Sequence, residues 1–216
     1  YNGELYVAGN FYEAGGVPVN NLAKWNGSSW SDVNGGLNST SVRHMTIYNG
    51  ELIVVGNFTS VGTPSLPAYG IARYGAAGWD TLGQGVTPGA VTASTYNGNL
   101  YAAGTIAIAG TTPVENVAKW DGTNWSKVGL GDGLNAQVEC SEVHNNELYI
   151  GGSFTETNNQ IILNHIARFN AGVGIWQPLY TGMNQDVSCL LSYGNDLYAG
   201  GFFTIAGGLV CNNIAR

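Results

Sequence analysis

Arg43 and His44 are the neighbouring side chains in this sequence that are best suited to ligand chemistry. Glu139 and Glu142 stand in a similar stretch further along the chain. A guanidinium, an imidazole and two carboxylates around one space could hold an ion or a small polar ligand, and histidine also transfers protons near neutral pH. Ordinary solvation of a water-filled channel would explain the same residue types equally well.

Other residues that often carry chemistry lack the required spacing. His44, His144 and His165 share no metal-like spacing, and the cysteines lack the C-x₂-C pattern of zinc sites. The chain contains no G-x-S-x-G or H-E-x-x-H motif. The Gly-rich stretch 129–133 precedes no helical pattern, which removes the phosphate-cradle interpretation. We therefore expect no metal, no cofactor and no catalytic residue.

Cysteine usage argues against a disulfide scaffold, because the chain has three cysteines, an odd number. Cys140 and Cys189 occupy the same position of two successive repeat units, after Val-Glu and Val-Ser. His44 and Thr92 occupy this position in two other units. This column predicts a small, tightly packed position filled by buried free thiols.

The elements that must position these residues recur along the chain. The phrase Tyr-Asn-Gly-Glu-Leu-Tyr-Val-Ala-Gly of residues 1–9 returns in recognisable form at positions 48, 96, 144 and 193. Self-similarity at a period of about 48 residues indicates a repeat protein, and residues 1–216 form one domain in this interpretation. We number the repeat units 1 to 5 by these five phrases and count the strand that leads into each phrase as part of its unit.

One unit predicts four antiparallel strands. In the second unit, 42–48 is a strand, Asn49-Gly50 is a hairpin turn and 51–58 is the return strand. A third strand at 70–74 and a fourth opened by Trp79 follow. The two tight turns of each unit then share one edge, and the longer connections share the opposite edge.

Composition supports an all-β chain and limits its partners. The 33 glycines, 12 tyrosines and 6 tryptophans suit strands joined by tight turns. The net charge of −7 argues against nucleic acid, which needs a basic surface, and no stretch reaches the length of a membrane span.

Four-stranded antiparallel units in tandem predict a β-propeller. The phrases Leu-Tyr-x-Gly-Gly-x-Phe-Thr, Asn-Ile-Ala-Arg-Trp and Gly-x-x-Trp resemble the kelch-like, galactose-oxidase-type propeller repeats of secreted bacterial surface proteins and fungal cortical marker proteins. The resemblance covers the whole chain and implies an extracellular or cell-surface location. The copper-binding Tyr and His set of galactose oxidase has no counterpart that we can place in this sequence.

The strand count predicts incomplete outer units. The five units supply three, four, four, four and three strands, or about four and a half repeats. We expect an excerpt of a larger propeller with roughly six to eight blades. An incomplete five-bladed ring is the alternative.

Three sets of side chains recur at matching positions of the units, and we expect a structural role for each. The cations of the third strand are expected to lie against aromatic rings and to pair with acids that follow the first turn, although a ring of cations facing an acidic ligand is the alternative. The outer-strand tryptophans are expected to pack the sheets rather than to bind sugars. The cations are Lys24, Arg73, Lys119, Arg168 and Arg216; the acids are Glu4, Glu51, Glu147 and Asp196; the tryptophans are Trp30, Trp79, Trp125 and Trp176.

Recognition is expected on the edge that carries the variable connections, because rigid strands present loops that are free to vary. These connections are 12–20, 59–69, 107–115, 155–164 and 204–212, together with 35–40, 83–89, 129–136 and 182–185. The side chains on them best able to contact a ligand are Tyr12, Glu13, Tyr69, Asn158, Asn159 and Gln160.

Two functions follow as hypotheses. The first is a non-enzymatic interaction or adhesion module that binds a protein or polysaccharide through this edge. The alternative is a carbohydrate-active or oxidase-type enzyme domain with its site at the channel mouth, near Arg43 and His44. A spacer in a larger surface assembly is a third interpretation.

Overall fold

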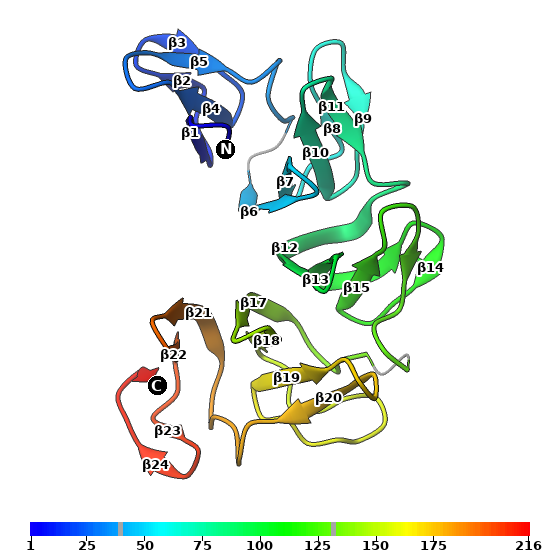
Figure 1. Ribbon diagram of the computed structural model, residues 1–216, viewed down its shortest axis with the longest axis vertical. Coiled ribbons are helices and arrows are strands. Elements are labelled where there is room, and N and C mark those ends of the chain that lie inside the picture. The colour runs from blue at the N-terminus through cyan, green and yellow to red at the C-terminus, as the bar shows by residue number, and fades with distance from the viewer. Residues whose placement is uncertain (39–40, 131–132) are drawn as a thin grey trace.

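The computed structural model describes residues 1–38, 41–130 and 133–216, and these ranges contain strands and no helix. Five antiparallel sheets follow one another along the chain, one for each repeat unit. Figure 1 shows them arranged along an open arc, with the two chain ends at its two extremes. The all-β prediction is confirmed.

The sheets of the repeat units have three or four principal strands. Unit 1 contains β1 (Leu5–Ala8), β4 (Leu22–Trp25) and β5 (Trp30–Asp32). Unit 2 contains β6 (Val42–Tyr48), β7 (Glu51–Gly56), β10 (Ile71–Gly75) and β11 (Gly78–Thr81). Unit 3 contains β12 (Val86–Tyr96), β13 (Asn99–Ala109), β15 (Val117–Trp120) and β16 (Trp125–Ser126). Unit 4 contains β17 (Val138–His144), β18 (Glu147–Gly152), β19 (Ile166–Asn170) and β20 (Ile175–Pro178). Unit 5 contains β21 (Val187–Tyr193), β22 (Asp196–Gly201) and β25 (Ile214–Ala215).

The first turn of units 1 to 4 has the predicted hairpin geometry, whereas in unit 5 only Gly194 of the Gly194-Asn195 turn has a positive φ. Asn49 and Gly50 have φ values of 49° and 77°, and Asn97 and Gly98 have 47° and 71°. A type I′ turn requires positive φ at both central residues, which asparagine and glycine adopt at low cost. These turns therefore set the register of the two strands that they join.

Hydrophobic clusters fill the spaces between successive sheets. One cluster joins units 2 and 3 through Ile53, Ile71, Leu100 and Ala118, all at or near complete burial. The remaining clusters join the other neighbouring pairs of units in the same way. Strands β6, β12, β17 and β21 consequently lie beside one another on the concave side of the arc (Figure 1).

The outer-strand tryptophans pack inside this arrangement, as predicted. Each lies about 5 Å, ring centre to ring centre, from the aromatic residue that ends the third strand. The pairs are Trp25–Trp30 at 5.3 Å, Tyr74–Trp79 at 5.1 Å, Trp120–Trp125 at 5.3 Å and Phe169–Trp176 at 5.0 Å.

The predicted cation–acid pairing is present in four units. The pairs are Lys24–Glu4 at 2.9 Å, Arg73–Glu51 at 3.3 Å, Arg168–Glu147 at 3.1 Å and Arg216–Asp196 at 3.5 Å. In unit 3, Asn99 occupies the place of the acid, and the cross-strand partner of Lys119 is Tyr101. The charged side chains of these pairs are not fully buried. Their side chains keep between about a quarter and two thirds of their exposure, because the head groups reach past the apolar residues between sheets.

The prediction of free thiols is confirmed, but the expected burial is not. Cys140 is partly buried and Cys189 is exposed. Strand β17 lies between β12 and β21, whereas among the described residues β21 contacts one inner strand, β17. The same sequence position therefore has different surroundings in units 4 and 5.

The long connections are more regular than expected from their sequence. They fold into short two-stranded ribbons: β2 (Glu13–Ala14) with β3 (Val17–Pro18), β8 (Ser60–Val61) with β9 (Leu66–Pro67), and β23 (Ile205–Ala206) with β24 (Leu209–Val210). In unit 3, β14 (Thr112–Pro113) instead pairs with the end of the long strand β13.

Candidate functional site

The long connections and the linkers between units meet on one face, which we call the long-loop face. Isolated bridges join Leu37 to Val61, Leu134 to Thr157 and Met183 to Ala206, so each of these linkers pairs with the long connection of the following unit. The backbone N–H groups of the same linker residues donate to Asn20, Glu115 and Asn164 of the preceding unit. Each linker therefore lies between two long connections.

An asparagine in the linker holds this face together in three places. Asn184 Oδ1 accepts hydrogen bonds from the N–H groups of Thr204 and Ile205, both at 2.9 Å, and Asn184 Nδ2 donates to Thr204 Oγ1 at 3.1 Å. Asn38 and Asn135 make the same three bonds in their own linkers. We call these three residues the linker asparagines. Their sequence signal is an Asn directly after Leu or Met in the linker, a signal that the repeat pattern alone does not single out.

Tyr12 lies at a polar cavity of about 380 Å³ between units 1 and 2, which we call the Tyr12 cavity. Its side chain is 63% exposed and leaves the ring accessible. The other polar side chains of the lining are amides and hydroxyls, with no charged group among the described residues. They belong to Asn20, Asn21, Asn38, Ser60, Thr63 and Ser65.

Tyr69 lies at a second cavity, of about 650 Å³, between units 2 and 3. This cavity is more apolar, because Leu66, Pro67 and Ile108 line it together with Tyr69. Tyr69 is 45% exposed. The two predicted tyrosines therefore lie at successive inter-unit cavities of the long-loop face.

The remaining predicted residues of this face do not join either cavity. Glu13 is exposed in β2 and pairs across the ribbon with Pro18. Asn158, Asn159 and Gln160 are exposed in a tight turn of unit 4, where the N–H of Gln160 donates to Thr157 O at 2.9 Å. Parts of the predicted loops 35–40 and 129–136 lie outside the described residues, as does part of the Gly-rich stretch 129–133.

The concave side carries a third cavity, of about 580 Å³, and it brings Arg43 and His44 together with Glu139 and Glu142. We call it the inner-strand cavity. Apart from Gln137, its lining residues come from β6, β12, β17 and β21. Thr92, Cys140, Ser141 and Cys189 also line it.

A β-bulge in every inner strand positions one side chain at this cavity. The register shifts between Val42 and His44, between Ala90 and Thr92, between Val138 and Cys140, and between Val187 and Cys189. The residues inside the shifts are Arg43, Val91, Glu139 and Ser188, and all four line the inner-strand cavity. Bulges redirect side chains in this way beside binding sites.

Burial controls protonation around the inner-strand cavity. It lowers the pKa of His44, whose Nδ1 accepts a hydrogen bond from the N–H of Ala93 at 3.4 Å, and thus favours neutral imidazole. Burial also raises the pKa of Glu142 and the pKa of the Cys140 thiol. The lowered pKa of His44 and the raised pKa of Glu142 reduce the charge in the cavity. The raised pKa of Cys140 favours an unreactive thiol.

Hydroxyl groups beside the cavity are bonded to one another. Ser141 Oγ lies 2.8 Å from both Thr92 Oγ1 and Ser94 Oγ. These contacts give Ser141 no base that would activate it as a nucleophile.

His144 and Ser192 form a serine–histidine contact of 2.8 Å through Nδ1 and Oγ. Asn145 Nδ2 donates to His144 Nε2 at 2.9 Å, so the tautomer consistent with both bonds places the proton on Nδ1. The imidazole then donates to the serine instead of accepting its proton. Among the described residues, no three His, Cys, Asp or Glu side chains gather into a set that could hold a metal ion.

Comparison with known protein families adds evidence on the repeat. A family model described as a β-propeller domain of unknown function (DUF5122) matches residues 2–28. Together with the succession of antiparallel sheets, this match supports a β-propeller-type repeat. No curated protein matches the chain.

Solved structures also resemble the chain, and 47 of their chains match. One is the computationally designed Ika4 protein, with a TM-score of 0.47 and 10% identity over 76% of this chain and 89% of that chain. In the described part of the chain, no helix has the length and apolar character needed to cross a bilayer.

Proposed function

We propose that this chain is a non-enzymatic interaction module of a kelch-like β-propeller, located outside the cell or on its surface. It binds its partner through the long-loop face. The partner class that matches this face best is a neutral polysaccharide, and a protein ligand is the other candidate of the same hypothesis.

The Tyr12 cavity is the observation that carries this proposal. An exposed aromatic ring beside amide and hydroxyl groups suits a sugar, which presents apolar C–H surface on one face and hydroxyl groups around its edge. An anionic or cationic ligand would find no opposite charge among the described lining residues. The linker asparagine Asn38 lies in this lining and accepts hydrogen bonds from the backbone of unit 2. Because the lining is already ordered, binding costs little conformational entropy.

A glycan array followed by calorimetry tests the proposal. We expect the native protein to bind at least one neutral glycan, and Tyr12→Ala to weaken that binding at least tenfold, equal to about 1.4 kcal/mol. Tyr193→Ala is the matched control, because Tyr193 is 73% exposed but lies in the tight-turn hairpin of unit 5. Equal binding by Tyr12→Ala and the native protein would contradict the assignment.

A further inference from the structure

A side-chain amide bonds the linker where units 1 and 2 meet, and again where units 4 and 5 meet. Asn20 Nδ2 donates to Gly35 O at 3.1 Å, and Asn164 Nδ2 donates to Thr181 O at 2.9 Å. Both asparagines stand at the end of a long connection. One linker carbonyl at each of these two junctions is therefore satisfied by an amide of the chain itself.

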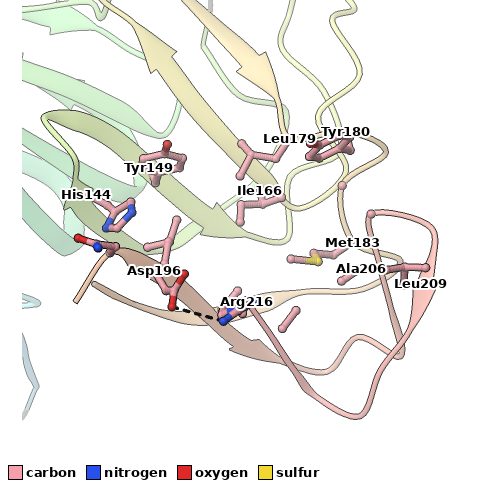
Figure 2. A pocket seen from close by; sticks show the side chains of 16 residues that line it. His144, Tyr149, Ile166, Leu179, Tyr180, Met183, Asp196, Ala206, Leu209 and Arg216 are labelled. Atoms are coloured by element: carbon pink, nitrogen blue, oxygen red, sulfur yellow. Dashed lines mark ion pairs between the residues drawn. The ribbon is translucent and has the colours of Figure 1, made fainter. Parts of the chain in front are cut away.

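The backbone of the same asparagines shows that the two junctions are equivalent. The N–H of Leu37 donates to Asn20 O at 3.0 Å, and the N–H of Met183 donates to Asn164 O at 2.8 Å. Figure 2 shows Met183 beside Ala206, its bridge partner in the long connection of unit 5. Each linker N–H comes two residues after the carbonyl that the side-chain amide bonds. This backbone bond therefore marks the same place in each junction.

The junction between units 2 and 3 has the backbone bond but lacks the amide. Tyr69 O accepts from the N–H of Val86 at 2.8 Å, so Tyr69 has the place of the asparagine. The equivalent linker carbonyl is Gln84 O, two residues before Val86. It accepts no hydrogen bond from any described residue, and Gln84 is exposed. This carbonyl is therefore open to a donor from outside the chain.

The cavity of about 650 Å³ between units 2 and 3, which we call the Tyr69 cavity, has both Tyr69 and Gln84 in its lining. Leu66, Pro67 and Ile108 form its apolar part. Tyr69 and Ile108 are each 45% exposed. No charged side chain lines this cavity among the described residues. Small-molecule sites of roughly 300–1,000 Å³ combine apolar walls with a few polar groups in the same way.

One ribbon separates the Tyr69 cavity from the Tyr12 cavity. Strand β8 lines the Tyr12 cavity through Ser60, and strand β9 lines the Tyr69 cavity through Leu66 and Pro67. Ser65, directly before Leu66, still belongs to the Tyr12 cavity. Paired strands lie only about 4.7–4.9 Å apart. One oligosaccharide that crosses the ribbon can therefore contact both cavities.

We propose that the Tyr69 cavity binds an N-acetylated sugar unit of the polysaccharide that the long-loop face recognises. This second site rests on the proposed function, because its ligand is part of the same polysaccharide. The acetamido N–H of the sugar donates to Gln84 O, in place of the missing asparagine amide. The acetamido methyl group lies against Leu66 and Ile108, and the sugar ring lies against Tyr69. Because an acetamido group is uncharged, it needs no charged partner in the lining.

A glycan array with matched pairs of neutral oligosaccharides, followed by calorimetry, tests the site. The members of a pair share their linkage and differ only in an acetamido or a hydroxyl group, as chitotetraose and cellotetraose do. We expect the native protein to bind the acetamido member of at least one pair at least tenfold more tightly. Tyr69→Asn should abolish this preference, because the asparagine can donate to Gln84 O itself and the aromatic ring is gone. Tyr69→Phe is the matched control, which keeps the ring and should retain the preference within about twofold.

Tyr12→Ala separates this site from the proposed function. It should weaken both members of a pair by the same factor, because Tyr12 lines the other cavity. Unchanged affinities in Tyr12→Ala, with the acetamido preference retained, would overturn the assignment of the Tyr12 cavity alone. Binding of no glycan at all would overturn both proposals.

Three outcomes would overturn the N-acetyl site alone. The first is equal affinity for the two members of every pair while glycan binding still depends on Tyr12. The second is an acetamido preference that persists in Tyr69→Asn, with the variant folded by circular dichroism. The third is a preference for 6-deoxy-mannose over mannose oligosaccharides, without an acetamido preference, that Tyr69→Asn removes. This last result would assign the cavity to a bare methyl group and leave Gln84 O without a role.

Discussion

At the scale of single residues, the linker asparagines show how a polar side chain orders a connection that has little apolar material. Asn135 satisfies two backbone N–H groups through one oxygen and adds a bond to Thr155 Oγ1 at 2.8 Å. Asparagine suits this position because its side-chain amide imitates a peptide group. These bonds, and not the strands alone, give the long-loop face its shape.

Replacing Asn135 with alanine should therefore loosen the long-loop face of unit 4. We expect a loss of about 1–2 kcal/mol in the free energy of unfolding, because two N–H groups lose their acceptor. Asn135→Asp keeps the acceptor oxygen and should lose less than half as much. Urea denaturation of the native protein and the two variants measures the free energies of unfolding. Equal decreases for Asn135→Ala and Asn135→Asp would contradict the role given to the acceptor oxygen of Asn135.

Tyr101 provides a residue-scale prediction for alkaline pH. Burial raises the pKa of Tyr101 to about 12 from its ordinary value of 10.0. The folded protein therefore holds the phenol proton more tightly than the unfolded chain does. Stability should be unaffected by this group below pH 10 and should fall as the pH rises from about 10 to about 12.

The size of this alkaline loss is about 2–3 kcal/mol for a shift of roughly two pKa units. Tyr101→Phe should remove it and flatten the stability curve between pH 10 and 12. Tyr193→Phe, at a residue that is 73% exposed, is the control that should leave the slope unchanged. Denaturation midpoints measured between pH 10 and 12 test this prediction. If the stability of Tyr101→Phe falls with pH as steeply as that of the native protein, the prediction is wrong.

At the scale of elements, packing between the sheets contributes more to stability than the ion pairs on their surfaces. Arg168 and Glu147 are each 39% exposed, whereas Phe154, which follows strand β18 of the same unit, is fully buried. Water screens exposed pairs and leaves them worth roughly 0–1 kcal/mol. The cation column is therefore a surface feature of the sheets.

This comparison predicts unequal effects within unit 4. Glu147→Gln should lower the free energy of unfolding by less than about 1 kcal/mol, and added salt should reduce the difference further. Phe154→Ala should lower it by about 3–5 kcal/mol, because it leaves a cavity in the core. Guanidinium and urea denaturation of both variants gives the two values, and a larger effect for Glu147→Gln would refute this ranking.

At the scale of the whole molecule, stability should be highest in the middle of the arc. Strand β13 has five consecutive buried residues, Leu100 to Gly104, while β1 alternates between exposed and half-buried residues and β22 has one buried residue. Units 2 to 4 have a neighbouring sheet on both sides among the described residues. In arrays of this type, each unit depends on contact with its neighbours.

Amide hydrogen exchange should reveal this gradient. We expect the slowest exchange in β12 and β13, intermediate rates in β7 and β18, and the fastest in β1 and β25. Mass spectrometry of exchanged peptides measures these rates segment by segment. Uniform protection from unit 1 to unit 5 would show that the sheets unfold as a single cooperative body instead.

The sequence by itself determined the repeats, the hairpin turns and the strand order, because turn chemistry and alternating burial are local properties of the chain. It also determined the pairing of third-strand cations with the acids after the first turn, since those strands are neighbours within one unit. It placed Arg43, His44, Glu139 and Glu142 in the first strands of units 2 and 4, because these strands recur with the repeat.

Only the tertiary structure decided how neighbouring units meet. The bulges that turn Arg43 and Glu139 toward the inner-strand cavity depend on a register shift between strands, and the polar cavity beside Tyr12 depends on two units approaching each other. Such features arise from contacts between residues some 20 to 50 positions apart, such as Trp79 with Val33 at a separation of 46, and no local pattern encodes them.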